Sequence, residues 1–293
     1  MCGIVGQFNF RDNSPVDQET IARMAESIRH RGPDDEGFYY SGSLGLGFRR
    51  LSIIDLSAGH QPMSDPSERY WVVFNGEIYN YPELRRELEA KGRVFRTNSD
   101  TETIVLGFAE WGDGILQRLR GMYGLALWDN LERRLLIARD PMGIKPVYYA
   151  KQNGKLWFGS EIRPILQALP QRPNVDVRAM SLFLQYRYTP APHTIHEGIK
   201  KLAAGEAIEV KNGQMRVFRH YGHQPSLQNP PPSDRDAAER LLELYKAAMK
   251  RHLLADVPVG LFLSGGIDSG LLLGLMNESG SNWPTFTVGY GSS

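Results

Sequence analysis

The only cysteine of the chain is its second residue, in the opening sequence MCGIVGQF. Removal of Met1 would place a thiol nucleophile and a free α-amine on one residue. A thiol titrates near ~8.5 and an α-amine near ~7.7–8.0, so the amine can accept the thiol proton at neutral pH without a histidine. The alternative is a small apolar residue at the start of a strand, because free cysteines usually pack as hydrophobes.

A cysteine that attacks an amide needs donors for the developing oxyanion, and the segment VVFNGEIYN offers them. The Asn75 side chain and the Gly76 backbone N–H are the candidates, and each such donor can be worth roughly 10²–10³ in rate. The alternative is structural, since Asn-Gly between two apolar runs is the strongest short signal for a type I′ hairpin turn.

Charged residues in loop-like sequence could bind the ends of an amino-acid substrate. Residues 31–37, RGPDDEG, and residues 48–56, FRRLSIIDL, contain arginines, and a guanidinium can bind a carboxylate through two parallel hydrogen bonds. Asp100, in the segment NSDTE, could bind an ammonium group. The alternatives are ordinary salt bridges for the arginines and a helix-capping role for the NSDTE segment.

A second chemical motif lies near the end of the sequence, in LFLSGGIDSG at residues 261–270. An apolar strand runs into glycines that let a backbone approach phosphate, and the following helix adds N–H donors. The spacing fits neither a Walker A loop nor GxGxxG. Asp268 favours a polyphosphate bridged by a metal ion, because a bare carboxylate would repel phosphate. A plain glycine turn is the structural alternative.

The first part of the chain alternates short apolar strands with amphipathic helices, which predicts a mainly antiparallel α+β fold. We expect helices near residues 18–29, 82–91, 101–111 and 177–185. We expect strands at CGIVGQFNF, LGLGFRRLSI, YWVVFNGEIYN, GLALWD, RRLLIARD, KPVYYAK and KLWFGS, and a hairpin at EAIEVKNGQMRVFRHY.

The composition changes at residues 223–236, HQPSLQNPPPSDRD, which hold four prolines and no apolar periodicity. We therefore place a linker there. A helix, a strand, the glycine turn, a second helix and the strand TFTVGY follow, which is a βαβ unit. Two parallel strands cannot cover their own sheet faces, so we expect residues 237–293 to open a larger α/β domain.

The bulk composition is that of a soluble globular protein, with 293 residues and a formal net charge of +1. This length predicts two domains. The balanced charge gives no field for nucleic acid or an anionic membrane, and no apolar run approaches the ~20 residues that span a bilayer. The single cysteine and the absence of a signal-peptide pattern predict a cytoplasmic protein. Because the sequence has no Cys/His cluster, we expect no catalytic zinc site.

The whole chain resembles the glutamine-dependent asparagine synthetases through an ordered set of motifs: MCGIVG, RHRGPDDEG, RRLSIIDLSAGHQPM, FNGEIYN, NSDTE, RDPMGIKPVYY and LSGGIDSG. The resemblance implies a glutaminase of the N-terminal-nucleophile type, a four-layer αββα sandwich, over residues 2–222. It also implies that residues 237–293 begin an α/β parallel-sheet ATP-pyrophosphatase domain.

The same resemblance implies roles for individual residues. Cys2 would attack the side-chain amide of glutamine with its own α-amine as base, while Asn75 and Gly76 stabilise the oxyanion. Arg50 would hold the glutamine α-carboxylate. The other residues around the glutamine would be Leu51, Ser52, Ile53, Ile54, Glu77 and Asp100, the last two near its α-ammonium.

In the second domain the resemblance implies ATP and Mg²⁺ as cofactors. Leu263 and Val288 would flank the adenine, and Asp268 would help to bind Mg²⁺. Aspartate would be activated as an acyl-adenylate, which the ammonia then attacks. The pyrophosphate would lie against Ser264, Gly265, Gly266, Asp268 and Ser269.

The chain departs from the family pattern at two points. Gly270 replaces a serine that many members carry, and the family's aspartate-binding segments would lie beyond Ser293. We therefore expect this chain by itself to hydrolyse glutamine without completing the synthesis. Three alternatives stay open: a sugar-phosphate or phosphoribosyl amidotransferase, amidation of a sugar or peptide carboxylate, and a non-catalytic glutamine-binding chain. The sequence leaves a homodimer open as well.

Overall fold

The computed structural model describes residues 1–55, 58–222, 233–278, 280 and 282–289. It divides into two compact units, Met1–Gly222 and His223–Ser293.

The described residues of unit 1 form twelve strands in two mainly antiparallel sheets. The first sheet has the order β10-β8-β9-β1-β3-β2 and the second the order β12-β11-β7-β6-β5-β4. The strands are β1 (Gly3–Asn9), β2 (Asp35–Ser41), β3 (Leu44–Arg50), β4 (Met63–Ser64), β5 (Tyr70–Ile78), β6 (Gly121–Asp129), β7 (Arg134–Arg139), β8 (Tyr148–Gln152), β9 (Lys155–Gly159), β10 (Ile199–Lys201), β11 (Glu206–Lys211) and β12 (Gln214–Arg219).

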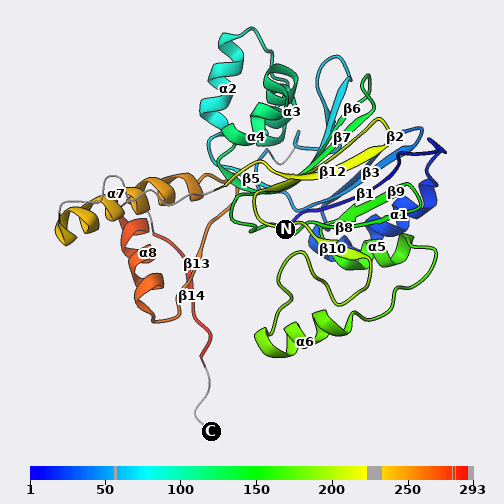
Figure 1. Ribbon diagram of the computed structural model, residues 1–293. Helices are drawn as coiled ribbons and strands as arrows, with labels where there is room; N and C mark the ends of the chain where they lie inside the picture. Colours follow the sequence, from blue (N-terminus) through cyan, green and yellow to red (C-terminus); the bar gives the residue numbers. More distant parts are fainter. Residues whose placement is uncertain (56–57, 223–232, 279, 281, 290–293) are drawn as a thin grey trace. The chain divides into compact units, whose positions relative to one another are not determined.

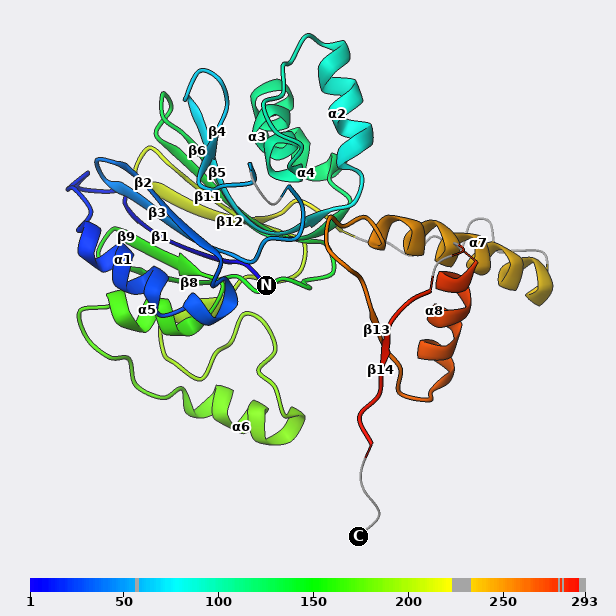
Figure 2. The same ribbon diagram turned by 180° about the vertical axis from the view of Figure 1, so that it is seen from behind.

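Helices cover the outer faces of the two sheets, as Figures 1 and 2 show from opposite sides. One group packs on the first sheet and the other on the second. The helices of unit 1 are α1 (Gln18–Glu26), the 3₁₀ turn η1 (Arg29–Arg31), α2 (Tyr81–Ala90), α3 (Asp100–Trp111), the 3₁₀ turn η2 (Gly112–Gly114), α4 (Ile115–Arg118), α5 (Ile162–Ala168) and α6 (Val177–Tyr186).

Three apolar cores separate the resulting four layers. Phe8 and Phe158 of the first sheet meet Trp128 of the second in the core between the sheets. Val5, the neighbour of Ile4 on β1, points the other way and packs with Ile21 of α1. This period-2 alternation is what a strand between two layers requires. The αββα sandwich predicted from the sequence is confirmed.

The structure corrects several local predictions. Asn75 and Gly76 lie within β5, paired with Gly124 and Tyr123 of β6, and not in a hairpin turn. The second half of the RGPDDEG segment is the start of β2 and not a loop. The sequence KPVYYAK follows GLALWD and RRLLIARD directly as a predicted strand, but it belongs to the other sheet as β8. The short elements β4, β10 and α5 had no recognised sequence signal.

Gly76 is required by its close approach to the neighbouring strand. A Cβ at this position would lie 2.0 Å from the Met122 carbonyl oxygen, which cannot move without breaking the sheet. We expect Gly76→Ala to lower the free energy of unfolding by about 2–3 kcal/mol in denaturant titrations. Gly114→Ala is the matched control, because the nearest atom to its added Cβ is 3.9 Å away. Equal stability of the two variants would contradict the packing argument.

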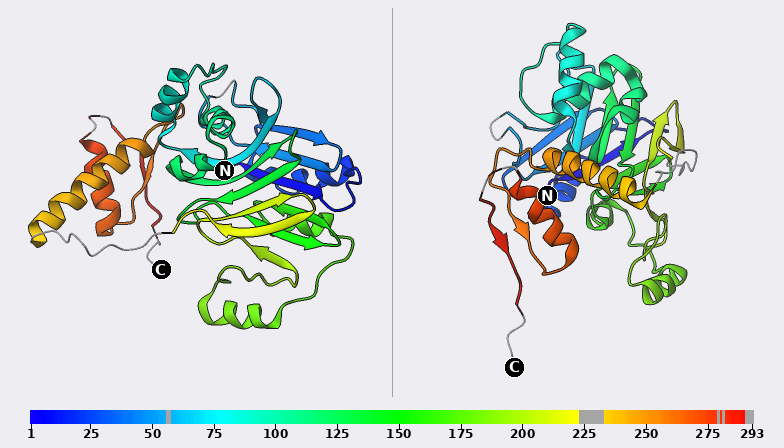
Figure 3. Two further views of the ribbon diagram at one scale, coloured as in Figure 1. Left: turned by 45° about the horizontal axis from the view of Figure 1, so that its top comes forward. Right: turned by 90° about the vertical axis from the view of Figure 1, so that its left-hand side faces the viewer.

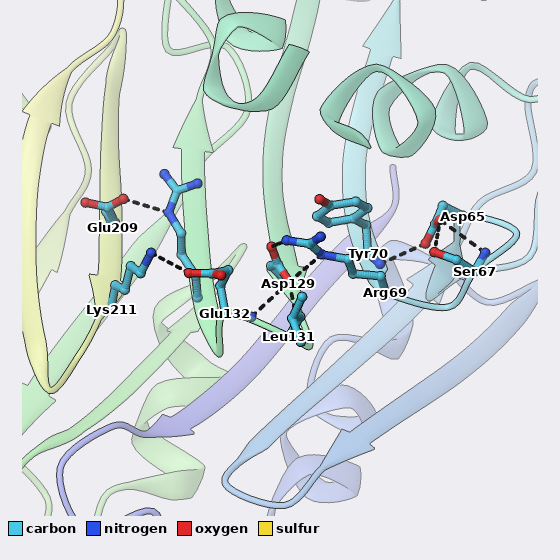
Figure 4. Close-up of polar contacts among 10 residues, drawn as sticks. Asp65, Ser67, Arg69, Tyr70, Asp129, Leu131, Glu132, Glu209 and Lys211 are labelled. Carbon is cyan, nitrogen blue, oxygen red and sulfur yellow. Dashed lines mark hydrogen bonds and ion pairs between the residues drawn. The ribbon is translucent and has the colours of Figure 1, made fainter. Parts of the chain in front are cut away.

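Polar contacts fasten the strand ends of the second sheet (Figure 4). Arg69, just before β5, makes a two-pronged ion pair with Asp129 at the end of β6, with N···O distances of 3.0 and 2.8 Å. Asp65 accepts hydrogen bonds from the backbone N–H of Ser67 and of Tyr70 in the turn before β5. These contacts fix the start of the strand that carries Asn75.

Unit 2 contains α7 (Asp234–His252), β13 (Leu261–Phe262), α8 (Ile267–Asn277) and β14 (Thr285–Phe286). The two strands pair in parallel, as the predicted βαβ unit requires. The helices α7 and α8 pack against each other (Figure 3), with an ion pair of 2.8 Å between Lys246 and Glu278.

The predicted linker at residues 223–236 falls mostly on residues 223–232, which lie outside the described part of the chain. Ser233 caps α7, so the last three residues of the predicted linker are helical. Among the described residues, no helix combines the length and apolar character needed to cross a membrane.

Candidate functional site

A cavity of about 50 Å³ lies at the start of β1, between the ends of strands from both sheets. By this measure it has room for a few water molecules. Its walls contain nearly all the residues of unit 1 to which the sequence analysis gave a role. They are Met1, Cys2, Arg50, Leu51, Ile53, Ile54, Gly59, Gln61, Phe74, Asn75, Gly76, Glu77, Ser99, Asp100, Thr101 and Lys145.

Cys2 lies at the base of this cavity, one residue before β1. Its Sγ is 3.4 Å from the Leu51 backbone nitrogen and 3.5 Å from the Leu51 carbonyl oxygen. Burial raises the pKa of the thiol, although the Leu51 hydrogen bond and the nearby N-terminal ammonium oppose that effect. A thiol in this position therefore stays protonated unless a base removes the proton.

The Cys2 backbone is held by Arg31, from η1. The Arg31 Nε donates to the Cys2 carbonyl oxygen at 2.9 Å, and its Nη1 donates to Glu161 at 3.2 Å. The sequence marked Arg31 only as a candidate carboxylate clamp. In the structure this guanidinium fixes the position of the N-terminal residue instead.

Asn75 supplies an unpaired donor to the same cavity. Its side chain is 1% exposed, and its Nδ2 is among the buried polar atoms for which the described residues provide no hydrogen-bond partner. Leaving a buried donor unpaired costs about 1–3 kcal/mol, so we expect a ligand or an ordered water to accept a hydrogen bond from this atom. A substrate carbonyl oxygen between Cys2 and Asn75 would satisfy it.

The backbone around Asn75 is fixed by Gln61, which sequence reasoning did not identify. Its Oε1 accepts from the Phe74 backbone N–H at 2.6 Å, and its Nε2 donates to the Phe74 carbonyl and to Thr101 Oγ1, each at 3.2 Å. Only the nonlocal pairing of residues 61, 74 and 101 reveals this role.

Arg50 closes one side of the cavity and is 6% exposed. Its Nη2 donates to the backbone carbonyls of Ile54 and Asp55, at 3.1 and 2.5 Å. The guanidinium thus holds the segment that follows β3 in a turn over the cavity. Ser52 is the one predicted pocket residue of this segment that does not line the cavity, and its backbone N–H donates to Asp34 at 2.9 Å.

Two carboxylates, Glu77 and Asp100, face the cavity from β5 and α3. Burial raises the pKa of Asp100 to about 7, and Glu77 contributes in the same direction. The Ile78 backbone N–H donates to Asp100 Oδ2 at 2.9 Å, which favours the charged form but does not offset burial. Ser99 caps α3, as the capping interpretation of the NSDTE segment predicts, and Asp100 in the first turn of that helix lines the cavity.

In unit 2, the SGGIDSG loop forms the predicted turn from strand to helix. Ser264 Oγ and Ser269 Oγ are 3.2 Å apart, and Gly265 has the positive φ of 78° that only glycine adopts readily. Asp268 is exposed in the first turn of α8. Leu263 pairs with Phe286 through a 2.8 Å backbone hydrogen bond, and Val288 is 75% exposed.

The predicted residues therefore form two sets, one around the cavity of unit 1 and one along the SGGIDSG loop of unit 2. In the described ranges, no three His, Cys, Asp or Glu side chains are grouped as a metal site would require.

Comparison with known proteins extends this picture. Residues 1–221 match the family of the glutamine amidotransferase domain, and residues 240–293 match the asparagine synthase family. Asparagine synthetase [glutamine-hydrolyzing] 1 of Bacillus subtilis (strain 168) is 37% identical over 292 residues, which cover 99% of this chain and 46% of that protein.

Two further relatives carry similar descriptions. A putative asparagine synthetase [glutamine-hydrolyzing] of Mycobacterium tuberculosis (strain ATCC 25618 / H37Rv) is 39% identical over 92% of this chain and 44% of its own length. Asparagine synthetase B [glutamine-hydrolyzing] of Escherichia coli (strain K12) is 31% identical over 93% and 44%, respectively. The chain thus spans about half the length of the curated relatives it matches.

The fold also has a solved counterpart. The glutamine phosphoribosylpyrophosphate amidotransferase of B. subtilis, in complex with ADP and GMP, aligns with a TM-score of 0.53 at 16% identity, covering 98% of this chain and 65% of that one. At this identity the likeness concerns the fold alone.

Proposed function

Because the chain belongs to the glutamine amidotransferase family, whose domain spans residues 1–221, we propose that unit 1 hydrolyses the side-chain amide of glutamine with Cys2 as nucleophile. The observation that carries this proposal is the placement of the Cys2 thiol and the unpaired Asn75 amide in the walls of one cavity. A nucleophile next to an unsatisfied donor is the minimal arrangement for acyl transfer.

The reaction would begin once Met1 is removed. The Cys2 α-amine takes the thiol proton as Sγ bonds to the amide carbon of glutamine, and the oxyanion accepts hydrogen bonds from Asn75 Nδ2 and the Gly76 N–H. Collapse of this tetrahedral intermediate breaks the C–N bond, and the ammonium of Cys2 returns its proton to the leaving ammonia. Water then cleaves the thioester and releases glutamate.

The rest of the cavity suits the α-carbon end of glutamine. Arg50 would bind the α-carboxylate, while Glu77 and Asp100 would bind the α-ammonium, so that opposite charges meet in a half-enclosed space. The backbone of Leu51, Ile53 and Ile54 would form the wall alongside. Ser52 belongs to the same backbone segment, although it is not among the residues that line the cavity.

For unit 2 we propose ATP binding at the SGGIDSG loop, with Mg²⁺ held in part by Asp268. The exposed glycines, the paired serines and the N-terminus of α8 suit a polyphosphate chain. The match of residues 240–293 to the asparagine synthase family supports this proposal. In the longer proteins that share both parts, the ammonia would amidate an aspartate carboxylate activated as an acyl-adenylate.

The purified chain should release glutamate and ammonia from glutamine in the absence of ATP and aspartate. Mass spectrometry of the same preparation should show loss of Met1, because the base is an α-amine only after that cleavage. A glutamate-dehydrogenase-coupled assay measures the rate. An active preparation that retains Met1 on every molecule would overturn the mechanism, and an inactive one that has lost Met1 would overturn the proposed activity.

A further inference from the structure

Lys145 lines the cavity but has no part in the proposed hydrolysis of glutamine. The residue is 6% exposed, and its Nζ lies 3.3 Å from the Sδ of Met1. A buried lysine destabilises the folded state unless an interaction with a nearby group offsets the loss of hydration, because burial disfavours the charged form. Burial indeed lowers the pKa of Lys145.

The turn that carries Lys145 is fixed by hydrogen bonds to the buried carboxylate of Asp140. Asp140 is 0% exposed, and its carboxylate accepts the backbone N–H groups of Met142 at 3.0 Å, Ile144 at 2.9 Å and Lys145 at 2.9 Å. It also accepts the Tyr123 N–H at 3.2 Å, which ties the turn to β6. The Asp140 carboxylate is thus occupied mainly by hydrogen bonds from backbone N–H groups.

Arg139 holds the same turn from its other side. Its guanidinium donates to the carbonyl oxygens of Gly143 at 2.5 Å, Lys145 at 2.8 Å and Leu202 at 2.6 Å. Side-chain bonds therefore fix both the N–H and the carbonyl of Lys145. The backbone of Lys145 is thus held on both sides, and the residue lines the cavity.

The charged groups around the N-terminus indicate how the Lys145 ammonium affects the protonation of the N-terminal amine. Burial, and after it the positive charges of Arg31 and Lys145, lower the pKa of the Met1 α-amine, whereas Cys2 and Asp34 act in the opposite direction. Arg31 donates through Nε to the Cys2 carbonyl and through Nη1 to Glu161, while its Nη2 has no partner among the described residues. The Nζ of Lys145 has Met1 Sδ as its contact. The groups that face Lys145 itself are Glu77 of β5, Arg31 of η1, Cys2 and Asp140.

Removal of Met1 takes away that contact and moves the free amine to Cys2. We propose that Lys145 is a positioning residue for the N-terminal nucleophile: its ammonium, fixed by the Asp140 turn, keeps the α-amine of Cys2 neutral and able to accept a proton. The inference rests on the proposed function of the amine as base. Two like charges in one poorly solvated cavity repel, so the amine gives up its proton more readily than it would beside an apolar side chain.

The single cysteine makes a direct test feasible. Growth on ¹³C,¹⁵N-labelled cysteine places the NMR label on Cys2 alone, and its chemical shifts report the titration of the α-amine. In Lys145→Met the midpoint of the amine titration should rise by about one pH unit. Lys145→Arg should keep the wild-type midpoint. Lys200→Met, which removes an exposed lysine on β10, is the control and should also keep it.

The kinetic counterpart is a pH profile. Lys145→Met should lose a larger share of its glutaminase rate at pH 6.5 than at pH 8.5, because the extra protonated amine matters only at the lower pH. A purely structural role for Lys145 would lower the rate equally at both. Lys145→Gln serves as a second variant if the methionine variant does not fold, as judged by thermal unfolding.

Equal amine midpoints in the wild type and both neutral variants would overturn the inference, and so would an equal rise in Lys200→Met. Failure of the proposed function has a different signature. A wild-type chain that lacks Met1 and does not hydrolyse glutamine would refute the activity, while the NMR titration would still decide whether Lys145 controls the amine.

Discussion

Cys2→Ala should abolish release of glutamate from glutamine, with a loss on the order of 10³-fold or more. The thiol is the group that forms the new bond, and removal of a nucleophile is among the most damaging changes to an enzyme of this type. Because Cys2 is the only cysteine, no other thiol can take its place. The coupled glutamate assay on protein of verified N-terminal mass measures the effect.

The alanine variant also separates chemistry from binding. Arg50, Asn75 and Asp100 all remain in place, so calorimetry should show glutamine binding close to that of the wild type. A chain prepared with Met1 retained should be as inactive as the alanine variant, since it keeps the thiol but has no free amine on Cys2. Glutaminase activity that survives the loss of the thiol would remove Cys2 from the mechanism.

Asp100→Asn should lower kcat/KM for glutamine by about 10²-fold. The change removes the charge that would meet the glutamine α-ammonium, and a charge-assisted hydrogen bond is worth about 1.5–3 kcal/mol. The asparagine oxygen can still accept the Ile78 N–H that Asp100 now binds at 2.9 Å, so the start of α3 should stay intact. Asp12→Asn, at an exposed aspartate outside the cavity walls, should leave kcat/KM unchanged.

The pH dependence of Asp100 follows from its pKa of about 7 in the folded chain, against 3.8 as the ordinary value. As the pH falls through 7 the carboxylate gains a proton and the wild type loses affinity for glutamine. Protonation of the Cys2 amine acts in the same range, so the acid limb of kcat/KM should be less steep in Asp100→Asn. An acid limb of the same slope in both proteins would exclude Asp100 as the ammonium ligand.

The same raised pKa affects stability with a definite sign. Because the folded state holds the proton more tightly than the unfolded state, the buried carboxylate costs stability above pH 3.8, and the cost is complete above about pH 7. Asp100→Asn should therefore unfold at a higher temperature than the wild type at pH 8. Near pH 3.8 this advantage should disappear.

Much of the fold could be predicted because its patterns are local. The apolar residues in GIVGQFNF predict a strand, and the proline-rich segment before α7 falls at the boundary between the two units. Pairing across the chain could not be predicted in the same way. The strand β8 joins the first sheet and β7 the second, although only residues 140–147 separate them, because register and partner depend on contacts with residues far away in sequence.

For the site, the sequence by itself determined the chemical inventory: one N-terminal thiol, an Asn-Gly pair, arginines near Leu51, an acid at position 100 and a glycine loop that opens a helix. Tertiary structure alone decided that Asn75 and Gly76 lie in a strand, that the Asn75 Nδ2 has no partner among the described residues, and that Lys145 lines the cavity while Ser52 does not. The physical reason is that burial, hydrogen-bond satisfaction and charge proximity are properties of neighbours in space. Those neighbours come from the two residues before β1, from β3, β5 and α3, and from the turn after β7, and only folding brings them together.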